Sequence, residues 1–306
     1  MSLVHFIVDP LSEKIGKQWP HEQPKIESIT KDFCVHLVRG RGHAESLTIQ
    51  AISQGAKLIV CVGGDAALSE IANALLVKDA KGVTVATYPR LHTGNFIKCC
   101  PSSSEFEQSL KDFLTGQAKT QSIDLGRISF RGEFGQKLSR YFLNYASFGF
   151  SSFLLHKTKN LKSERINRSR FWRFLFQSLP FYKIPAYRIQ LDEEEIQHHF
   201  VLTGFINNSP YAMRNLRTSA QSQLSDGKIE FTEFKKTALY RYFVNAVQIY
   251  AGQFEKLSFV NTSSCEKIKI EPVLSSRAIR VDFDGECRGY LPADFSVVKG
   301  ALRILQ

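Results

Sequence analysis

Two glycines and an aspartate, Gly63-Gly64-Asp65, stand between an apolar run at 57–62 and a segment whose apolar residues are three and four positions apart. The run predicts a strand buried on both faces, and the spacing predicts a helix over about 67–76. Paired glycines let a backbone come close to a ligand, and the first turn of a helix offers free N–H groups to a phosphate. Asp65 could hold Mg²⁺ or polarise a hydroxyl, whereas the alternative is a turn with a capping aspartate.

Two differently patterned halves of the chain must position these residues. Up to about residue 120, strand-like and helix-like segments alternate, which is the pattern of a parallel sheet covered by helices. Beyond it, shorter alternating segments with turn signals between them predict an antiparallel sandwich or barrel. One helix is expected within this second half, and one of its faces carries Leu239, Phe243, Ala246, Val247 and Tyr250.

Charge and composition narrow the class of protein. The 306 residues include 40 Lys and Arg against 29 Asp and Glu, and the net charge of +11 favours an anionic partner. The apolar runs fall short of the roughly 18 residues that a membrane span needs, and the N-terminal residues lack the pattern of a signal peptide. The six cysteines include no C-x-x-C pair. These features predict a cytoplasmic protein with reduced thiols that is associated with membranes only peripherally.

Motifs spread in order along nearly the whole chain resemble those of the diacylglycerol kinase catalytic-domain superfamily, which contains diacylglycerol kinases, sphingosine kinases and bacterial lipid kinases. The turn at 63–65 is similar to the start of the family's Gly-Gly-Asp-Gly-Thr hallmark, and the Asp-Gly-Glu at 284–286 is similar to another of its motifs. The matching segments are 9–13, 41–44, 63–70, 92–96, 123–126, 142–150, 224–229 and 281–286.

The resemblance implies a fold of the α/β plus all-β class. An NAD kinase-like α/β nucleotide-binding domain would span 1–121, completed by 295–306, and an antiparallel β-sandwich domain for the lipid substrate would span 122–294. It also implies a kinase that transfers the γ-phosphoryl group of ATP to a hydroxyl of a diacylglycerol-like or sphingoid lipid at a membrane surface. The nucleotide-binding positions that carry over are Asp9, Ser12, Gly63, Gly64, Asp65, Ala66, Ala67, Ser69, Thr93, Gly94 and Asn95.

Carboxylates make up most of the other positions that the resemblance singles out. The catalytic residues that carry over are Asp65, Asp284 and Glu286. The expected Mg²⁺ ligands are Asp226 and the main-chain carbonyls of Gln223 and Lys228. Which carboxylate of the Asp-Gly-Glu turn takes the hydroxyl proton stays open. The alternatives are a solvated hairpin for that turn and an ordinary Asp-Gly turn for the metal segment.

Six positions in the expected nucleotide site depart from the family's pattern. They are Glu13, Val38, Ala66, Ala67, His92 and Phe96. Ala66 stands for the third glycine of the hallmark and would be strained if that position required positive φ. Glu13 places negative charge where a triphosphate is expected, unless Lys14 or Lys17 neutralises it. The alternative function is therefore a catalytically impaired lipid- or nucleotide-binding regulatory protein on the same fold.

A cationic segment adjoins an aromatic one at 157–176. Seven basic residues stand there against one acid, followed by several aromatic residues that include Trp172. Cations near an anionic leaflet and aromatic rings in the headgroup region together favour membrane binding. The alternative is a solvated charged segment that leads into a core helix. We expect a lipid substrate and an anionic membrane as partners, leave a homodimer open, and expect no nucleic acid because no recognition motif for it is present.

Overall fold

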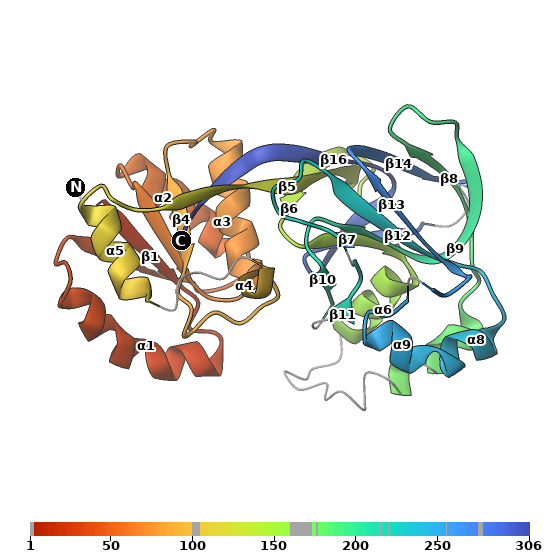
Figure 1. Ribbon diagram of the computed structural model, residues 1–306, viewed down its shortest axis with the longest axis horizontal. Coiled ribbons are helices and arrows are strands. Elements are labelled where there is room, and N and C mark those ends of the chain that lie inside the picture. Colours follow the sequence, from red (N-terminus) through yellow and green to blue (C-terminus); the bar gives the residue numbers. More distant parts are fainter. Residues whose placement is uncertain are drawn as a thin grey trace. The chain divides into compact units, whose positions relative to one another are not determined.

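The computed structural model describes residues 3–99, 105–159, 173–175, 177–213, 216–219, 221–254, 256–274 and 278–306. The chain forms two compact units, which are shown in Figure 1. The first comprises Met1–Leu125, Leu224–Gly227 and Val298–Gln306, and the second comprises Gly126–Gln223 and Lys228–Val297. The boundary expected near residue 121 falls at 125, and the turn at 224–227 belongs to the first unit.

A parallel sheet forms the centre of the first unit, in the strand order β2–β1–β3–β4–β16. Its strands are β1 (Val4–Val8), β2 (Phe33–Leu37), β3 (Leu58–Val62), β4 (Thr84–Thr87) and the last residues of β16 (Glu286–Leu305). The side chains of β1 and β3 are all buried, as predicted for strands covered on both faces. The helices are α1 (Glu13–Glu27), α2 (His43–Ser53), α3 (Asp65–Val77), α4 (Phe96–Cys99) and α5 (Phe106–Leu114).

Helix α1 is an element that the sequence pattern does not predict. Pro20 and Pro24 lie inside it, and each interior proline costs about 3 kcal/mol. The helix forms because Ile15, Trp19 and Ile26 are buried in the core of the first unit. Each such side chain stabilises the fold by about 1.5–3 kcal/mol, so burial offsets the prolines.

Antiparallel strands make up the second unit, as predicted. Strands β9, β7, β15, β16, β14 and β8 pair in that order, and β8 returns to β9, so this path is closed. The strands are β5 (Thr120–Arg131), β6 (Lys137–Phe142), β7 (Tyr145–Gly149), β8 (Ala186–Leu191), β9 (Gln197–Asn207), β10 (Tyr211–Ala212), β11 (Leu216–Arg217), β12 (Ile229–Lys235), β13 (Val260–Cys265), β14 (Lys267–Pro272), β15 (Arg280–Phe283) and the first part of β16. An α/β unit followed by a β-rich unit confirms the predicted fold class.

Alternate side chains of these strands face two different cores. Phe148 and Ile206 belong to one core, whereas Tyr145, three positions before Phe148, and Phe205, next to Ile206, pack in the other. Helices contribute to the second of these cores, as their position on one side of the strands in Figure 1 shows. They are α6 (Phe150–Lys159), the short 3₁₀ helix η1 (Leu179–Phe181), α8 (Leu239–Val244) and α9 (Ala246–Tyr250).

The helix expected over 239–250 is in fact two short helices. α8 ends and α9 begins at Asn245, whose backbone angles of φ −94° and ψ 8° interrupt the helical path. Two members of the expected face, Phe243 and Val247, are 40% and 80% exposed. Tyr242, which is 6% exposed, packs in the core instead.

Most of the basic and aromatic segment at 157–176 lies outside the described residues, so its predicted role stays a prediction. In the part of the chain that the structure describes, we find no helix with the length and hydropathy that crossing a membrane would require. The cysteines whose side chains are described, Cys34, Cys61, Cys99 and Cys265, are free thiols.

Candidate functional site

The predicted nucleotide-binding residues of the first unit lie on loops that follow neighbouring parallel strands. Asp9 comes directly after β1, Gly63 comes directly after β3, and the loop with Thr93 follows β4. Ligands of open parallel sheets bind at this edge, outside the carboxyl ends of the strands. The Asp9 carboxylate accepts the backbone N–H of Leu11 at 3.2 Å, and Ser12 stands just before α1.

Gly64 is needed because another backbone segment approaches it. Gly64 and Thr93 form an isolated parallel bridge, and the N–H of Thr93 donates to the carbonyl of Gly63 at 3.3 Å. A Cβ atom on Gly64 would lie 2.7 Å from the carbonyl oxygen of Thr93. Its φ of −96° is open to any residue, so the constraint is space and not conformation.

Asp65 holds the loop at 92–96 against the start of α3. Its carboxylate accepts the backbone N–H of Asn95 at 2.6 Å and that of Phe96 at 3.2 Å. The Nε2 of His92, whose side chain is fully buried, lies 3.1 Å from the same carboxylate and donates to it. A Cβ atom on Gly94 would lie 2.0 Å from Asp65 Oδ1. Hydrogen bonds therefore hold the predicted turn at 63–65 and the predicted loop at 92–96 together.

Several departures from the family's pattern are accommodated by this arrangement. Ala66 lies inside the first turn of α3, where a helical backbone has negative φ, so it is not strained. The ring of His92 donates to the Asp65 carboxylate, and the Phe96 side chain is fully buried while its backbone N–H donates to the same carboxylate. Glu13 pairs with Lys17 at 2.7 Å, which is the neutralisation that the sequence left open. Ala67 and Ser69 are buried in α3.

Asp284 and Gly285 are the two central residues of the hairpin that joins β15 to β16. Their φ angles are +46° and +81°, and a two-residue hairpin of type I′ requires positive φ at both positions. The Asp284 carboxylate accepts the backbone N–H groups of Leu143 at 2.7 Å, Asn144 at 2.8 Å and Tyr145 at 3.3 Å. These bonds offset a left-handed conformation that costs a non-glycine residue about 1–3 kcal/mol.

Glu286, the second carboxylate of this turn, has a different partner. Its Oε2 accepts the Nε–H of Arg288 at 2.5 Å and also contacts the other end of that guanidinium. Arg288 is the extra residue of a register shift in β16, since Asp282 is opposite Cys287 and Val281 is opposite Gly289. The turn thus carries one carboxylate held by backbone amides and one held by a cation.

The expected magnesium ligands are divided between the units. Asp226 lies in the turn at 224–227 of the first unit, whereas Gln223 and Lys228 belong to the second unit. Asp226 is exposed and precedes Gly227, whose φ is +71°. Among the described residues no three His, Cys, Asp or Glu side chains gather as they would to hold a metal.

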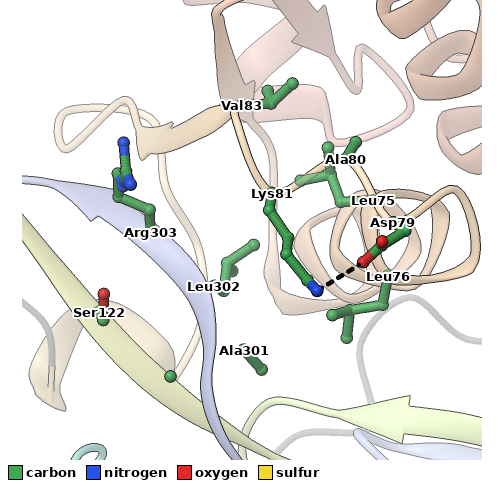
Figure 2. Close-up of a pocket in the computed structure, with 11 residues that line it drawn as sticks. Leu75, Leu76, Asp79, Ala80, Lys81, Val83, Ser122, Ala301, Leu302 and Arg303 are labelled. Carbon is green, nitrogen blue, oxygen red and sulfur yellow. Dashed lines mark ion pairs between the residues drawn. The ribbon is translucent and has the colours of Figure 1, made fainter.

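The first unit also has a pocket of about 250 Å³ between the end of α3 and β16 (Figure 2). Its lining includes Leu75, Leu76, Ala80, Ser122, Leu302 and Arg303. Figure 2 shows the Lys81 ammonium pointing to the Asp79 carboxylate, with 3.2 Å between Nζ and Oδ1. None of the predicted site residues lines this pocket, so the loops at the strand ends remain the candidate site.

Two family models match this chain. The diacylglycerol kinase catalytic domain family matches residues 4–128, and the family of YegS C-terminal NAD kinase beta sandwich-like domains matches residues 145–306. The chain belongs to the diacylglycerol kinase catalytic-domain superfamily. The family predicted from the motifs is confirmed.

Relatives in this superfamily match over most of their length. A diacylglycerol kinase of Mycobacterium tuberculosis (strain CDC 1551 / Oshkosh) is 27% identical over 282 residues, which cover 89% of this chain and 84% of the relative. A diacylglycerol kinase of Staphylococcus saprophyticus is 20% identical over 301 residues, which cover 97% and 93%. The crystal structure of a diacylglycerol kinase from Bacillus anthracis matches with a TM-score of 0.68 and 15% identity, covering 99% of this chain and 96% of that one.

Two acidic residues of this superfamily member support the site and were not predicted to do so. Glu70 accepts the N–H of Gly42 at 2.7 Å and that of Ala44 at 3.0 Å, so α3 positions the start of α2. Asp124, which is buried, accepts the N–H of Gly227 and that of Gly300, each at 2.7 Å. Both acids lie in segments that match the superfamily's motifs, which is the signal that could have singled them out.

Asp282 is a third acid that sequence reasoning missed. It is 1% exposed, and its carboxylate accepts the hydroxyls of Ser147 and Ser152, the latter at 2.5 Å. Burial raises the pKa of Asp282 to about 6, although hydrogen bonds from Ser147, Ser152 and Tyr145 oppose this. Asp282 lies in the matching segment 281–286, which is the same signal, but its serine partners are distant in sequence.

The raised pKa of Asp282 predicts a pH-dependent stability. The folded state binds this proton more tightly than the unfolded state does, so the free energy of unfolding falls as pH rises from about 4 to about 6. Asp282→Asn removes the titration. Measured by urea unfolding, the difference in the free energy of unfolding between variant and wild type should shift in the variant's favour by about 2 kcal/mol between about pH 4 and about pH 7.

Ser147→Ala provides the opposite test, because it removes a hydroxyl that stabilises the charged carboxylate. This variant should lose stability more steeply than wild type over the same pH range. Parallel pH profiles for Asp282→Asn and wild type would contradict the assignment.

Proposed function

We propose that this chain is a lipid kinase that transfers the γ-phosphoryl group of ATP to a hydroxyl of a diacylglycerol-like or sphingoid lipid at a membrane surface. The Asp284-Gly285-Glu286 hairpin carries the proposal. It places two carboxylates on one turn, and three backbone N–H groups hold the first of them in place. A hydroxyl that attacks a phosphoryl group needs such an acceptor for its proton.

In this proposal the first unit binds the nucleotide. The N–H groups in the first turn of α3 have no partners within the helix and would donate to phosphate oxygens. Asp65 keeps the loop with Thr93 beside this turn, so the hydroxyl of Thr93 would join the same oxygens. Asp9 and Ser12 would border the site from the end of β1.

In the second unit, a carboxylate of the hairpin would take the proton of the lipid hydroxyl. The hydroxyl oxygen then bonds to the γ-phosphorus, the bond from that phosphorus to the bridging oxygen breaks, and ADP leaves with the electron pair. Asp226 would be the carboxylate ligand of Mg²⁺, since its exposed oxygens suit a cation that takes oxygen ligands. When bound, Mg²⁺ supplies charge neutralisation for the phosphate groups.

Two observations support a lipid substrate and action at a membrane. Relatives that match most of this chain are named diacylglycerol kinases. The net charge of +11 favours attraction to an anionic leaflet.

Transfer of labelled γ-phosphate into lipid tests the proposal. The full chain is incubated with Mg²⁺, γ-labelled ATP and extracted membrane lipids, and the products are separated from ATP. We expect labelled lipid that disappears when a chelator removes Mg²⁺, and matched reactions with diacylglycerol or a sphingoid base identify the acceptor class.

A second candidate is a lipid- or nucleotide-binding protein without kinase activity. The observation in its favour is that the Asp65 carboxylate already accepts hydrogen bonds from the loop at 92–96. Retained binding of ATP and lipid without any labelled product would overturn the kinase proposal and support this candidate.

A further inference from the structure

Helices α8 and α9 of the second unit present an apolar stripe to solvent. Four of their apolar side chains are well exposed: Tyr240 at 63%, Phe243 at 40%, Val244 at 75% and Val247 at 80%. Positions three and four residues after Tyr240 share one side of α8, and Val247 follows on α9 just beyond the break at Asn245. Monomeric soluble proteins rarely expose apolar side chains gathered in this way, so such a surface indicates an interaction site. We call these four residues the α8–α9 stripe.

Buried contacts on the opposite side of the two helices keep the stripe exposed to solvent. Tyr242 is buried, its hydroxyl donates to the carbonyl of Lys235 at 2.5 Å, and its ring meets that of Phe259 edge-on at 5.2 Å between centroids. Ile249 of α9 packs against the same core. A rotation that buried the stripe would expel Tyr242, so the exposure belongs to the folded state.

Positive charge flanks the stripe. The sequence from 235 to 254 contains Lys235, Lys236 and Arg241 and no Asp or Glu. Lys235 Nζ lies 3.3 Å from a carboxylate oxygen of the buried Glu233, which offsets its charge. Lys236 and Arg241 are therefore the cations that give this surface its positive charge. Lys236 Nζ lies 5.4 Å from the centre of the Phe200 ring, another aromatic side chain that is 55% exposed.

We propose that the α8–α9 stripe, with Lys236 and Arg241 beside it, docks the protein onto an anionic lipid bilayer. Apolar side chains would enter the headgroup boundary while the cations meet lipid phosphates. A second copy of this chain is a poorer occupant, because a two-fold interface on this surface would bring like charges together. The inference deepens the proposed function, which requires access to a membrane, and it concerns described residues outside 157–176.

Sedimentation with lipid vesicles tests the surface without ATP, so its outcome does not depend on catalysis. Vesicles of phosphatidylcholine alone are compared with equimolar phosphatidylcholine and phosphatidylglycerol. We expect wild type to bind the anionic vesicles and Val244→Asp to lower the partition coefficient by more than about fivefold, because one added negative charge opposes binding as much as one cation favours it. Arg241→Gln should lower it by about fivefold on anionic vesicles only.

Val77→Asp is the matched control. Val77 is 63% exposed and is the last residue of α3, as Val244 is of α8, so both variants make the same change at the same kind of position. We expect the control to bind vesicles as wild type does. Equal binding by Val244→Asp and Val77→Asp would overturn the proposal. A wild-type dimer that Val244→Asp dissociates would also overturn it, since a second copy would then occupy the stripe.

The two proposals can fail separately. A short-chain diacylglycerol below its critical micelle concentration presents the hydroxyl without any lipid interface, so activity on it does not require the stripe. Loss of vesicle binding by Val244→Asp with retained activity on this monomeric lipid supports the stripe, whereas wild-type vesicle binding without any phosphoryl transfer rejects only the kinase proposal.

Discussion

Replacing Asp284 with asparagine should lower the turnover of the proposed kinase reaction at least a hundredfold, with the KM for ATP nearly unchanged. The substitution removes a carboxylate that is a candidate base, and general base catalysis contributes about 10²–10⁴ in rate. In wild type, backbone N–H groups of 143–145 donate to both carboxylate oxygens of Asp284. Asparagine has an NH₂ group in place of one of these oxygens, and that group cannot accept a hydrogen bond from them. The residues proposed to bind the nucleotide belong to the first unit, so ATP binding should persist.

Glu286→Gln is the control for the base assignment. It weakens the contact with Arg288 and leaves the three bonds to Asp284 in place. If this variant keeps turnover within about tenfold of wild type, Asp284 is the base; a loss of about 10² or more assigns the proton to Glu286. A folded Asp284→Asn protein with more than a tenth of wild-type turnover would contradict a role for this hairpin in catalysis.

Substituting alanine for Gly94 should destabilise the first unit and weaken its binding of ATP. The added Cβ would lie 2.0 Å from Asp65 Oδ1 and 2.3 Å from its Cγ, so the loop and the carboxylate must separate. Hydrogen bonds to a charged group contribute about 1.5–3 kcal/mol each, and the bonds from Asn95 and Phe96 are both at risk. We expect a loss of about 3 kcal/mol in urea unfolding and a Kd for ATP raised more than tenfold.

Gly82→Ala makes the same substitution elsewhere in the first unit. A Cβ atom there would meet no heavy atom within 4 Å, so this control should change the free energy of unfolding by less than about 0.5 kcal/mol. Equal stability and equal ATP affinity for the two alanine variants would show that Asp65 does not depend on the close approach of Gly94.

The sequence predicted the elements whose patterns are local. The run at 57–62 indicated a buried strand, and the turn after it indicated where a ligand could approach the backbone. Helix α1 escaped prediction because Pro20 and Pro24 argue against a helix locally, while the burial that stabilises it involves residues from other elements. The break at Asn245 escaped for a similar reason, since the apolar spacing continues across it.

The candidate site also contains features that depend on contacts between residues far apart in the chain. His92 departs from the family's motif, yet its ring donates to Asp65, which is 27 positions away in the chain. Asp282 lies in the matching segment 281–286, but no spacing could predict its partners, because the serines that bind it are 135 and 130 residues away. Hydrogen-bond partners of this kind cannot be read from periodicity, which reports only on near neighbours.

By itself the sequence determined the strand and helix pattern of the two halves and the positions of the Gly-Gly-Asp and Asp-Gly-Glu turns, because these follow from short-range spacing of apolar residues, glycines and acids. The superfamily came from the resemblance of its motifs to those of a known family. Only the tertiary structure decided that Asp65 and Asp284 each secure a distant backbone segment, and that the stripe on α8 and α9 faces outward. The physical reason is that burial and hydrogen-bond geometry are set by contacts between residues far apart in the chain.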